Sequence, residues 1–381
     1  MNRTVVLVSN TSWSFVKFRL PLLIRLRAEG YRVIVVAPRD DESAAFEANG
    51  LIYEPLTGLQ QQGKNPWHDY QLYHEFRRIY KRWQPDLAIH YTIKPNIYAT
   101  KAAASLGIPC IAVITGLGYT FIKGGLLSRI TDTLYRKALK SAAQVWFLNE
   151  DDRRVFVEHR GIVPLEKAVL IHGEGIDAKT YFNPGQYEAA KRGGEDVAVK
   201  FIFVGRLLYD KGIREYVAAA AQIKARYPEA GFSILGYLNV GNPSAVDEAT
   251  VAAWERRGVV QYLGSAPDVR LVLQDHDCVV LPSYREGMST TLMEAAAMGL
   301  PLIASDIAGC RELVEDGVTG FLCEARNAGS LAERMAAFIQ LRSSERVAMG
   351  KRGREKMLRE CDMDGIIQHY LQAIRLIMTG K

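Results

Sequence analysis

The sequence has few cysteines, and they are not arranged as a disulfide framework or a zinc site. Its 381 residues include only five, with no CxxC pair among them. They are scattered along the chain as Cys110, Cys278, Cys310, Cys323 and Cys361. An odd and dispersed set of this kind is typical of a reducing compartment. We therefore expect a cytoplasmic protein that folds without disulfides.

Long hydrophobic runs and a strong excess of one charge are also missing. No stretch reaches the roughly 18 to 20 uninterrupted apolar residues of a membrane-spanning helix. Residues 1–10 lack the charged region and cleavage site of a secretory signal. The net charge of +6 is mild. It suits an anionic ligand, an anionic membrane surface or simply a solvated surface better than nucleic acid, which we do not expect as a partner.

Several catalytic signatures are absent. Segment 9–14, directly after the first apolar run, contains no glycine, so the dinucleotide-binding fingerprint is missing. No P-loop, GxSxG elbow or zinc-ligand spacing occurs elsewhere, which argues against hydride transfer and P-loop chemistry. The triplet Asp275-His276-Asp277 matches a metal-binding DxD, but it precedes a predicted strand instead of following one. We expect it to be a solvated loop, and we expect neither a metal site nor a cofactor.

Short apolar runs alternate with amphipathic helical patterns along the chain, as is typical of βαβ units in a parallel sheet. The rhythm breaks in a polar, turn-rich stretch and then restarts. We predict an α/β protein of two Rossmann-like, doubly wound domains with a deep cleft between them. The predicted parts are an N-terminal domain at 1–178, a linker at 179–198, a C-terminal domain at 199–361 and a last helix at 362–381 that packs back on the N-terminal domain.

The stretch 283–295 carries the clearest chemistry. It follows a buried apolar run as a loop and the first turns of a helix, whose unpaired N–H groups near Ser289 and Thr290 can hold a diphosphate. If the span is mostly helical, Glu286 and Glu294 lie about 12 Å apart along its axis. That exceeds the roughly 5 to 9.5 Å between paired carboxylates of glycosidases. It fits a nucleotide sugar, with Glu286 on the sugar and Glu294 on the ribose, although a capped helix with two surface glutamates is the alternative.

Two cations follow the first predicted strand of the second half. Arg206 and Lys211 are expected at the same sheet edge as Glu286, where they could neutralise a departing diphosphate without a metal. A turn with two solvated charges is the alternative. The predicted catalytic residues are Glu286, Arg206 and Lys211. The predicted donor-binding residues are Gly205, Gly287, Met288, Ser289, Thr290 and Glu294.

These motifs resemble the donor site of the retaining GT-B glycosyltransferases of family four. The matching segments are Gly205-Arg206-Leu207 with Lys211-Gly212, Glu286-Gly287 with Glu294-Ala295, Gly309-Cys310-Arg311-Glu312-Leu313-Val314, and Gly173-Glu174-Gly175-Ile176-Asp177. In the last of these, Glu174 stands where the family more often has Asn. The resemblance implies a GT-B fold, a UDP-sugar donor, retention at the anomeric carbon and no catalytic metal.

The N-terminal half resembles a narrower group within that family. Phe18-Arg19-Leu20-Pro21, Lys94-Pro95-Asn96 and Gly116-Leu117-Gly118-Tyr119-Thr120-Phe121 are similar to bacterial transferases that add a hexose or N-acetylhexosamine to a polyprenyl-diphosphate-linked sugar. Many family members have a His where this chain has Gly116 and Leu117, so the role of that His is assigned to no residue of this sequence. The acceptor-binding candidates are His90, Lys94, Gly116 and Gly118.

Segment 116–140 combines apolar and basic residues with one acid, Asp132. A basic amphipathic helix of this kind can lie in an anionic membrane interface without spanning it. An ordinary helix that packs its apolar side on a sheet is the alternative. We expect this segment to hold the protein peripherally at the cytoplasmic membrane face, close to a lipid-linked glycan acceptor.

The sequence therefore predicts a glycosyltransferase that moves a sugar from a UDP-sugar to a glycan in polysaccharide or glycoprotein glycan assembly. With no clear protein nucleophile, one route to retention is front-face attack, in which the leaving phosphate itself accepts the acceptor's proton; the sequence leaves the choice between this route and a catalytic base open. Two alternatives stay open at this point. One is a UDP-sugar epimerase on the same two-domain plan, and the other is a non-catalytic nucleotide-sugar-binding protein.

Overall fold

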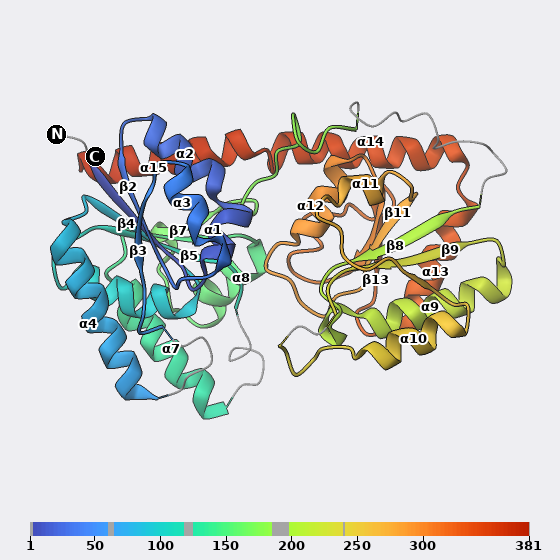
Figure 1. The fold of residues 1–381 in the computed structure, drawn as a ribbon, viewed down its shortest axis with the longest axis horizontal. Helices are drawn as coiled ribbons and strands as arrows, with labels where there is room; N and C mark the ends of the chain where they lie inside the picture. Colours follow the sequence, from blue (N-terminus) through green and yellow to red (C-terminus); the bar gives the residue numbers. More distant parts are fainter. Residues whose placement is uncertain (1–2, 60–64, 118–124, 185–197, 239–240, 381) are drawn as a thin grey trace. The chain divides into compact units, whose positions relative to one another are not determined.

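The computed structural model describes residues 3–59, 65–117, 125–184, 198–238 and 241–380. They form two compact units, each with its own sheet and hydrophobic core (Figure 1). Unit 1 comprises residues 1–175 and 363–381, and unit 2 comprises residues 176–362.

Unit 1 is built on a seven-stranded parallel sheet with the order β3-β2-β1-β4-β5-β6-β7. The strands are β1 (Thr4–Val8), β2 (Arg32–Ala37), β3 (Ile52–Pro55), β4 (Leu87–Tyr91), β5 (Cys110–Ile114), β6 (Gln144–Phe147) and β7 (Ala168–Leu170). The helices are α1 (Ser12–Phe18), α2 (Leu20–Ala28), α3 (Ala44–Ala48), α4 (Pro66–Trp83), α5 (Thr100–Ala104), α7 (Gly125–Leu139), α8 (Glu150–Arg154) and α15 (Met363–Thr379). Single turns lie at η1 (Asp41–Ser43), η2 (Pro95–Ala99), η3 (Val155–His159) and η4 (Leu165–Lys167).

Helices cover both faces of this sheet, which explains why its central strands are apolar along their whole length. Successive side chains of a strand point to opposite faces. Val6 and Val8 of β1 share one core with Phe76 of α4 and Tyr135 of α7. On the other face, α2 contacts β2 and α15 contacts β4.

Unit 2 repeats the plan with a six-stranded parallel sheet in the order β10-β9-β8-β11-β12-β13. The strands are β8 (Lys200–Val204), β9 (Gly231–Leu235), β10 (Gln261–Tyr262), β11 (Cys278–Leu281), β12 (Leu302–Ser305) and β13 (Gly320–Cys323). The helices are α9 (Ile213–Arg226), α10 (Glu248–Arg256), α11 (Arg270–Leu273), α12 (Thr290–Ala297), α13 (Ala328–Gln340) and α14 (Ser343–Glu360), with a 3₁₀ turn at η7 (Tyr209–Lys211). Helices α9 and α13 pack on each other, as do α12 and α14.

The last helix, α15, is part of unit 1. Its Tyr370 is buried, accepts a hydrogen bond from the hydroxyl of Tyr91 at 3.2 Å and packs on the ring of Trp146 with 4.6 Å between centroids. Near the helix C-terminus, Arg375 donates to Glu29 at 2.9 Å. The chain therefore returns to unit 1 after completing unit 2.

The chain enters unit 2 earlier than the predicted linker begins. Ala178 and Phe182 are buried in the core of unit 2. The backbone carbonyls of both residues accept hydrogen bonds from the guanidinium of Arg354, at 2.8 Å each. Of the predicted linker at 179–198, residues 185–197 lie outside the described residues.

In the described part of the chain, no helix combines the length and the apolar character needed to span a membrane. The five cysteines are all free thiols, and each is buried.

The packing of α15 predicts a graded response to truncation of its side chains. Tyr370→Ala removes a buried aromatic ring and the acceptor of the Tyr91 hydroxyl, so unit 1 should lose about 3–5 kcal/mol of unfolding free energy. Leu376→Ala on the same helix is the control because Leu376 is 48% exposed, and it should change little. Denaturant unfolding followed by tryptophan fluorescence measures both. Equal stability of the two variants would contradict the packing described here.

Candidate functional site

The candidate donor site lies where the chain leaves β8 and β11 in unit 2. These strands are neighbours at the centre of the sheet, where the strand order changes direction. In parallel α/β sheets, ligands bind outside the carboxyl ends of the strands at this point. Gly205 and Arg206 follow β8, and the loop containing Glu286 follows β11. The sheet thus brings the two predicted halves of the site to one edge.

An ion pair joins the two loops. Lys211 Nζ donates to Glu286 Oε1 at 2.6 Å. The side chain of Glu286 is only 10% exposed and that of Lys211 is 22% exposed, so water screens the pair weakly. Two of the three predicted catalytic residues therefore contact each other directly, and the lysine fixes the position of the carboxylate.

The pair depends on a close approach of two backbone segments. Gly212, directly after Lys211, has φ +73°, and a Cβ added there would lie 1.9 Å from the carbonyl oxygen of Pro282. The backbone N–H of Tyr284 donates to the carbonyl of Asp210 at 2.9 Å and closes the same contact. Only glycine allows both this backbone conformation and this distance.

Helix α12 begins at Thr290, where the sequence analysis predicted an anion-binding helix N-terminus. Ser289 caps it, accepting a hydrogen bond from the N–H of Leu292 at 3.4 Å. Among the residues that the structure describes, the N–H groups of Thr290 and Thr291 have no acceptor. Unpaired N–H groups at the first turn attract negative charge. Behind this turn, the carbonyl of Gly309 accepts from Ser289 N–H at 3.1 Å.

Helix α12 covers only part of the span from Glu286 to Glu294, for which the sequence analysis considered a mostly helical conformation. Because α12 starts at Thr290, residues 286–289 are a loop, and the spacing of about 12 Å for a fully helical span does not apply. Glu294 lies one turn into the helix and is 7% exposed. Met288 is half-buried against the core of unit 2.

Arg206 differs from the other predicted catalytic residues. Its side chain is exposed, and it forms no hydrogen bond or ion pair with any residue in the described ranges. Gly205 before it donates its N–H to the carbonyl of Leu235 at 3.0 Å, which fixes the backbone at the strand end. Arg206 is therefore a cation held near the site by its backbone and available to a ligand.

Sequence reasoning missed a half-buried hydrogen-bonded pair beside the site. Tyr284, in the loop after β11, donates its hydroxyl to Glu215 of α9 at 2.7 Å. Burial, followed by this bond, raises the pKa of Tyr284 to about 12. Nothing in the sequence separates this tyrosine from other loop tyrosines, because its partner is 69 residues away.

Unit 1 has a pocket of about 320 Å³ at the carboxyl ends of β1, β4 and β5. Two predicted acceptor residues, Lys94 and Gly116, line it. Lys94 donates to Asp69 at 2.9 Å, and Asp69 also accepts from the hydroxyl of Tyr98 at 2.7 Å. Gly118 lies outside the described residues.

The pocket also contains residues that the sequence analysis did not select. Asn10 and Thr92 line it. Thr92 directly follows β4, and Asn10 lies shortly after the end of β1. Polar residues at this position of neighbouring parallel strands share one sheet edge, which is the signal that could have identified them.

His90 is not part of this pocket wall. It lies within β4, is fully buried, and has both ring nitrogens in hydrogen bonds, with Tyr80 and with Thr100, at 2.8 Å each. Burial lowers its pKa to about 3, so the ring is neutral. Neither ring nitrogen is left to bind the glycan acceptor, so we remove His90 from the candidate acceptor-binding residues.

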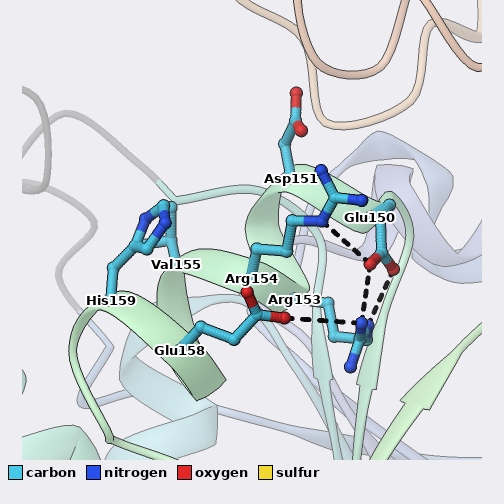
Figure 2. A pocket seen from close by; sticks show the side chains of 7 residues that line it. All are labelled: Glu150, Asp151, Arg153, Arg154, Val155, Glu158 and His159. Carbon is cyan, nitrogen blue, oxygen red and sulfur yellow. Dashed lines mark hydrogen bonds and ion pairs between the residues drawn. The ribbon is translucent and has the colours of Figure 1, made fainter.

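A larger pocket of about 550 Å³ lies beside α8 and η3 in unit 1 (Figure 2). Its guanidinium groups are already paired. Arg153 donates to both oxygens of Glu150, at 2.6 and 2.7 Å, and Arg154 donates to the same carboxylate at 3.1 Å. We therefore assign this pocket no anion-binding role.

The described residues contain no group of three or more His, Cys, Asp or Glu side chains that could hold a metal ion. The triplet at 275–277 is structural. His276 is bonded to Ser233 at 2.9 Å and to the carbonyl of Val272 at 2.8 Å, and Asp277 accepts from the N–H of Lys200 at 2.8 Å. It thus lies at the start of β8 and β11, at the opposite sheet edge from Glu286.

Comparison with known families identifies the chain. Residues 21–179 match the family described as Glycosyltransferase Family 4, and residues 189–356 match Glycosyl transferases group 1. The chain belongs to glycosyltransferase family four. It is an enzyme of the transferase class with the GT-B fold.

Individual relatives agree with this assignment. The chain is 27% identical over 379 residues to N,N'-diacetylbacillosaminyl-diphospho-undecaprenol alpha-1,3-N-acetylgalactosaminyltransferase of Campylobacter jejuni, covering 96% of each chain. Its fold resembles a glycosyltransferase from Rickettsia africae, with a TM-score of 0.81 at 16% identity over 100% of both chains. It also resembles Alr3699/HepE of Anabaena, solved with UDP and glucose, with a TM-score of 0.78 at 19% identity over 97% of this chain and 99% of that one.

The close approach at Gly212 predicts a matched pair of glycine variants. Gly299 has φ +72° and open space around it. Gly299→Ala should therefore lower the unfolding free energy by about 1–2 kcal/mol, the cost of an alanine in the left-handed conformation. Gly212→Ala meets the Pro282 carbonyl as well and should cost about 1–3 kcal/mol more. Thermal unfolding measures the difference. Variants of equal stability would show that the two loops are not held in contact.

Proposed function

We propose that this enzyme transfers a hexose or N-acetylhexosamine from a UDP-sugar to a polyprenyl-diphosphate-linked glycan, with retention at the anomeric carbon. The observation that carries the proposal is the pairing of Lys211 with Glu286 beside the free N–H groups of α12. The names of two relatives support its substrates. The Campylobacter enzyme acts on a diphospho-undecaprenol acceptor, and the Anabaena protein was solved with UDP.

In this proposal the donor's diphosphate lies between two cationic side chains and two backbone N–H groups. Lys211 and Arg206 face it from the β8 side, and the N–H groups of Thr290 and Thr291 face it from the β11 side. As the bond from the anomeric carbon to the phosphate oxygen breaks, negative charge grows on the diphosphate. Groups that are already oriented stabilise this charge without reorganising.

The two glutamates are assigned to opposite ends of the donor. Glu286, held by Lys211, orients hydroxyl groups of the transferred sugar, and Glu294 binds the ribose. Retention without a protein nucleophile follows from front-face attack. The acceptor oxygen bonds to the anomeric carbon on the side that the phosphate leaves, and a phosphate oxygen accepts its proton.

The alternatives receive less support. An epimerase would need no acceptor site, whereas unit 1 has a polar pocket at the carboxyl ends of three strands. A non-catalytic binding protein would not need the complete set of Arg206, Lys211, Glu286 and Glu294. The relative that covers 96% of the chain is named as a transferase.

Helix α7 is the proposed contact with the membrane. Arg129 and Lys137 are exposed on it, Lys140 is exposed directly after it, and Asp132, its acid, is paired with Arg160 at 2.7 Å. The described part of α7 therefore has a basic surface, which attracts anionic lipid headgroups. Residues 118–124 of the same segment lie outside the described residues. The enzyme would work in this way at the cytoplasmic face of the membrane.

The role of the cations predicts a specific loss of turnover. Arg206→Ala should lower kcat by about 10²–10³-fold because one group that stabilises the leaving diphosphate is gone. Arg257→Ala, at an exposed arginine after α10, should leave kcat unchanged. Release of UDP with an undecaprenyl-diphosphate-linked acceptor measures both. Full turnover by Arg206→Ala would remove this residue from the mechanism.

The membrane contact predicts weaker binding to anionic lipids after charge reversal on α7. Arg129→Glu with Lys137→Glu should reduce sedimentation with phosphatidylglycerol vesicles, by roughly 1 kcal/mol for each basic residue at the surface. Arg256→Glu with Arg257→Glu changes the net charge equally in unit 2 and serves as the control. Equal binding by the two double variants would place the membrane contact elsewhere.

A further inference from the structure

Two of the residues that line the pocket of unit 1 each have a buried side-chain oxygen without a partner in the described part of the chain. These oxygens are Oδ1 of Asn96 and Oγ1 of Thr92, and neither has a hydrogen-bond partner among the described residues. A buried polar atom left unpaired costs about 1–3 kcal/mol. Native structures rarely keep two such atoms in one place without a use for them.

The amide of Asn96 has a defined orientation. Its Nδ2 donates to the carbonyl of Val113 at 2.8 Å, and the side chain is completely buried. The free atom is therefore the amide oxygen, which only accepts hydrogen bonds. A ligand group that satisfies it must donate an N–H or an O–H.

Thr92 adds backbone strain to the same wall. Its φ is +69°, a conformation that a β-branched residue seldom adopts. Strain of this kind costs about 1–3 kcal/mol and concentrates at functional sites. Thr92 is half-buried. Rotation about χ1 sets the position of its hydroxyl oxygen.

The charge of the pocket argues against a phosphate there. Among the described residues of the wall, only Lys94 is charged, and its ammonium is bound to Asp69. The amide oxygen of Asn96 would repel a phosphate oxygen because both are acceptors. The volume of about 320 Å³ lies at the lower end of the roughly 300–1,000 Å³ of small-molecule pockets.

From these observations we infer that the pocket binds an uncharged sugar of the acceptor, through a hydroxyl or acetamido N–H that donates to Asn96 and Thr92. The acceptor's diphosphate lies outside it. This inference rests on the proposed function for the identity of the acceptor. It goes further by making Thr92 and Asn96 the residues that recognise the terminal sugar.

The test measures sugar binding directly, so that it does not depend on transfer. Saturation-transfer NMR is recorded with methyl glycosides of N-acetylglucosamine and N-acetylgalactosamine in the presence of saturating UDP, which occupies the donor site. Wild type and Thr92→Ser, which keeps the hydroxyl, should bind a glycoside. Thr92→Val, which keeps the shape but lacks the hydroxyl, should weaken binding at least tenfold.

A second variant guards against loss of folding. Thr92→Gly removes the hydroxyl and relieves the strain of a positive φ, so it should be at least as stable as wild type and still fail to bind the sugar. Binding equal to wild type in both Thr92→Val and Thr92→Gly would overturn the inference. So would no binding to wild type, or displacement of the sugar by inorganic pyrophosphate.

The outcomes separate this inference from the proposed function. Sugar binding that depends on the Thr92 hydroxyl, in a protein that transfers nothing to a lipid-linked glycan, would uphold the pocket and refute the transfer. Transfer with an acceptor KM unchanged in Thr92→Val would uphold the function and refute the pocket.

Discussion

The ion pair between Lys211 and Glu286 is the interaction on which the candidate donor site depends. It connects the loop after β8 with the loop after β11, at a side-chain separation of 2.6 Å. That distance is possible only because Gly212 lets the backbone reach the Pro282 carbonyl. Remove the contact between the loops, and Arg206, the carboxylate and the first turn of α12 no longer converge on one position.

Much of this arrangement could be predicted because parallel strands impose it. Once 201–204 and 279–281 are recognised as strands of one sheet, Arg206 and Glu286 must follow at the same edge. His90 shows the limit of the rule. It lies inside β4 and not beyond its end, so its ring points into the core and bonds to Tyr80. A difference of one or two positions relative to the end of a strand therefore determines whether a side chain is buried or exposed.

Long-range partners could not be predicted from spacing. Glu174 departs from the usual residue of its motif, and the structure shows why it fits: it accepts a hydrogen bond from the buried Arg19, whose guanidinium lies 3.9 Å from the ring centroid of Tyr91. Arg19 and Glu174 are 155 residues apart. The buried oxygens of Asn96 and Thr92 could not be predicted either, because their lack of partners among the described residues depends on contacts between distant parts of the chain.

The structure of the enzyme with UDP bound tests the central claim most directly. The account predicts the diphosphate within hydrogen-bond distance of Arg206, Lys211 and the N–H groups of Thr290 and Thr291, with the ribose at Glu294. UDP bound in unit 1, or in unit 2 with its diphosphate away from the loops after β8 and β11, would contradict it.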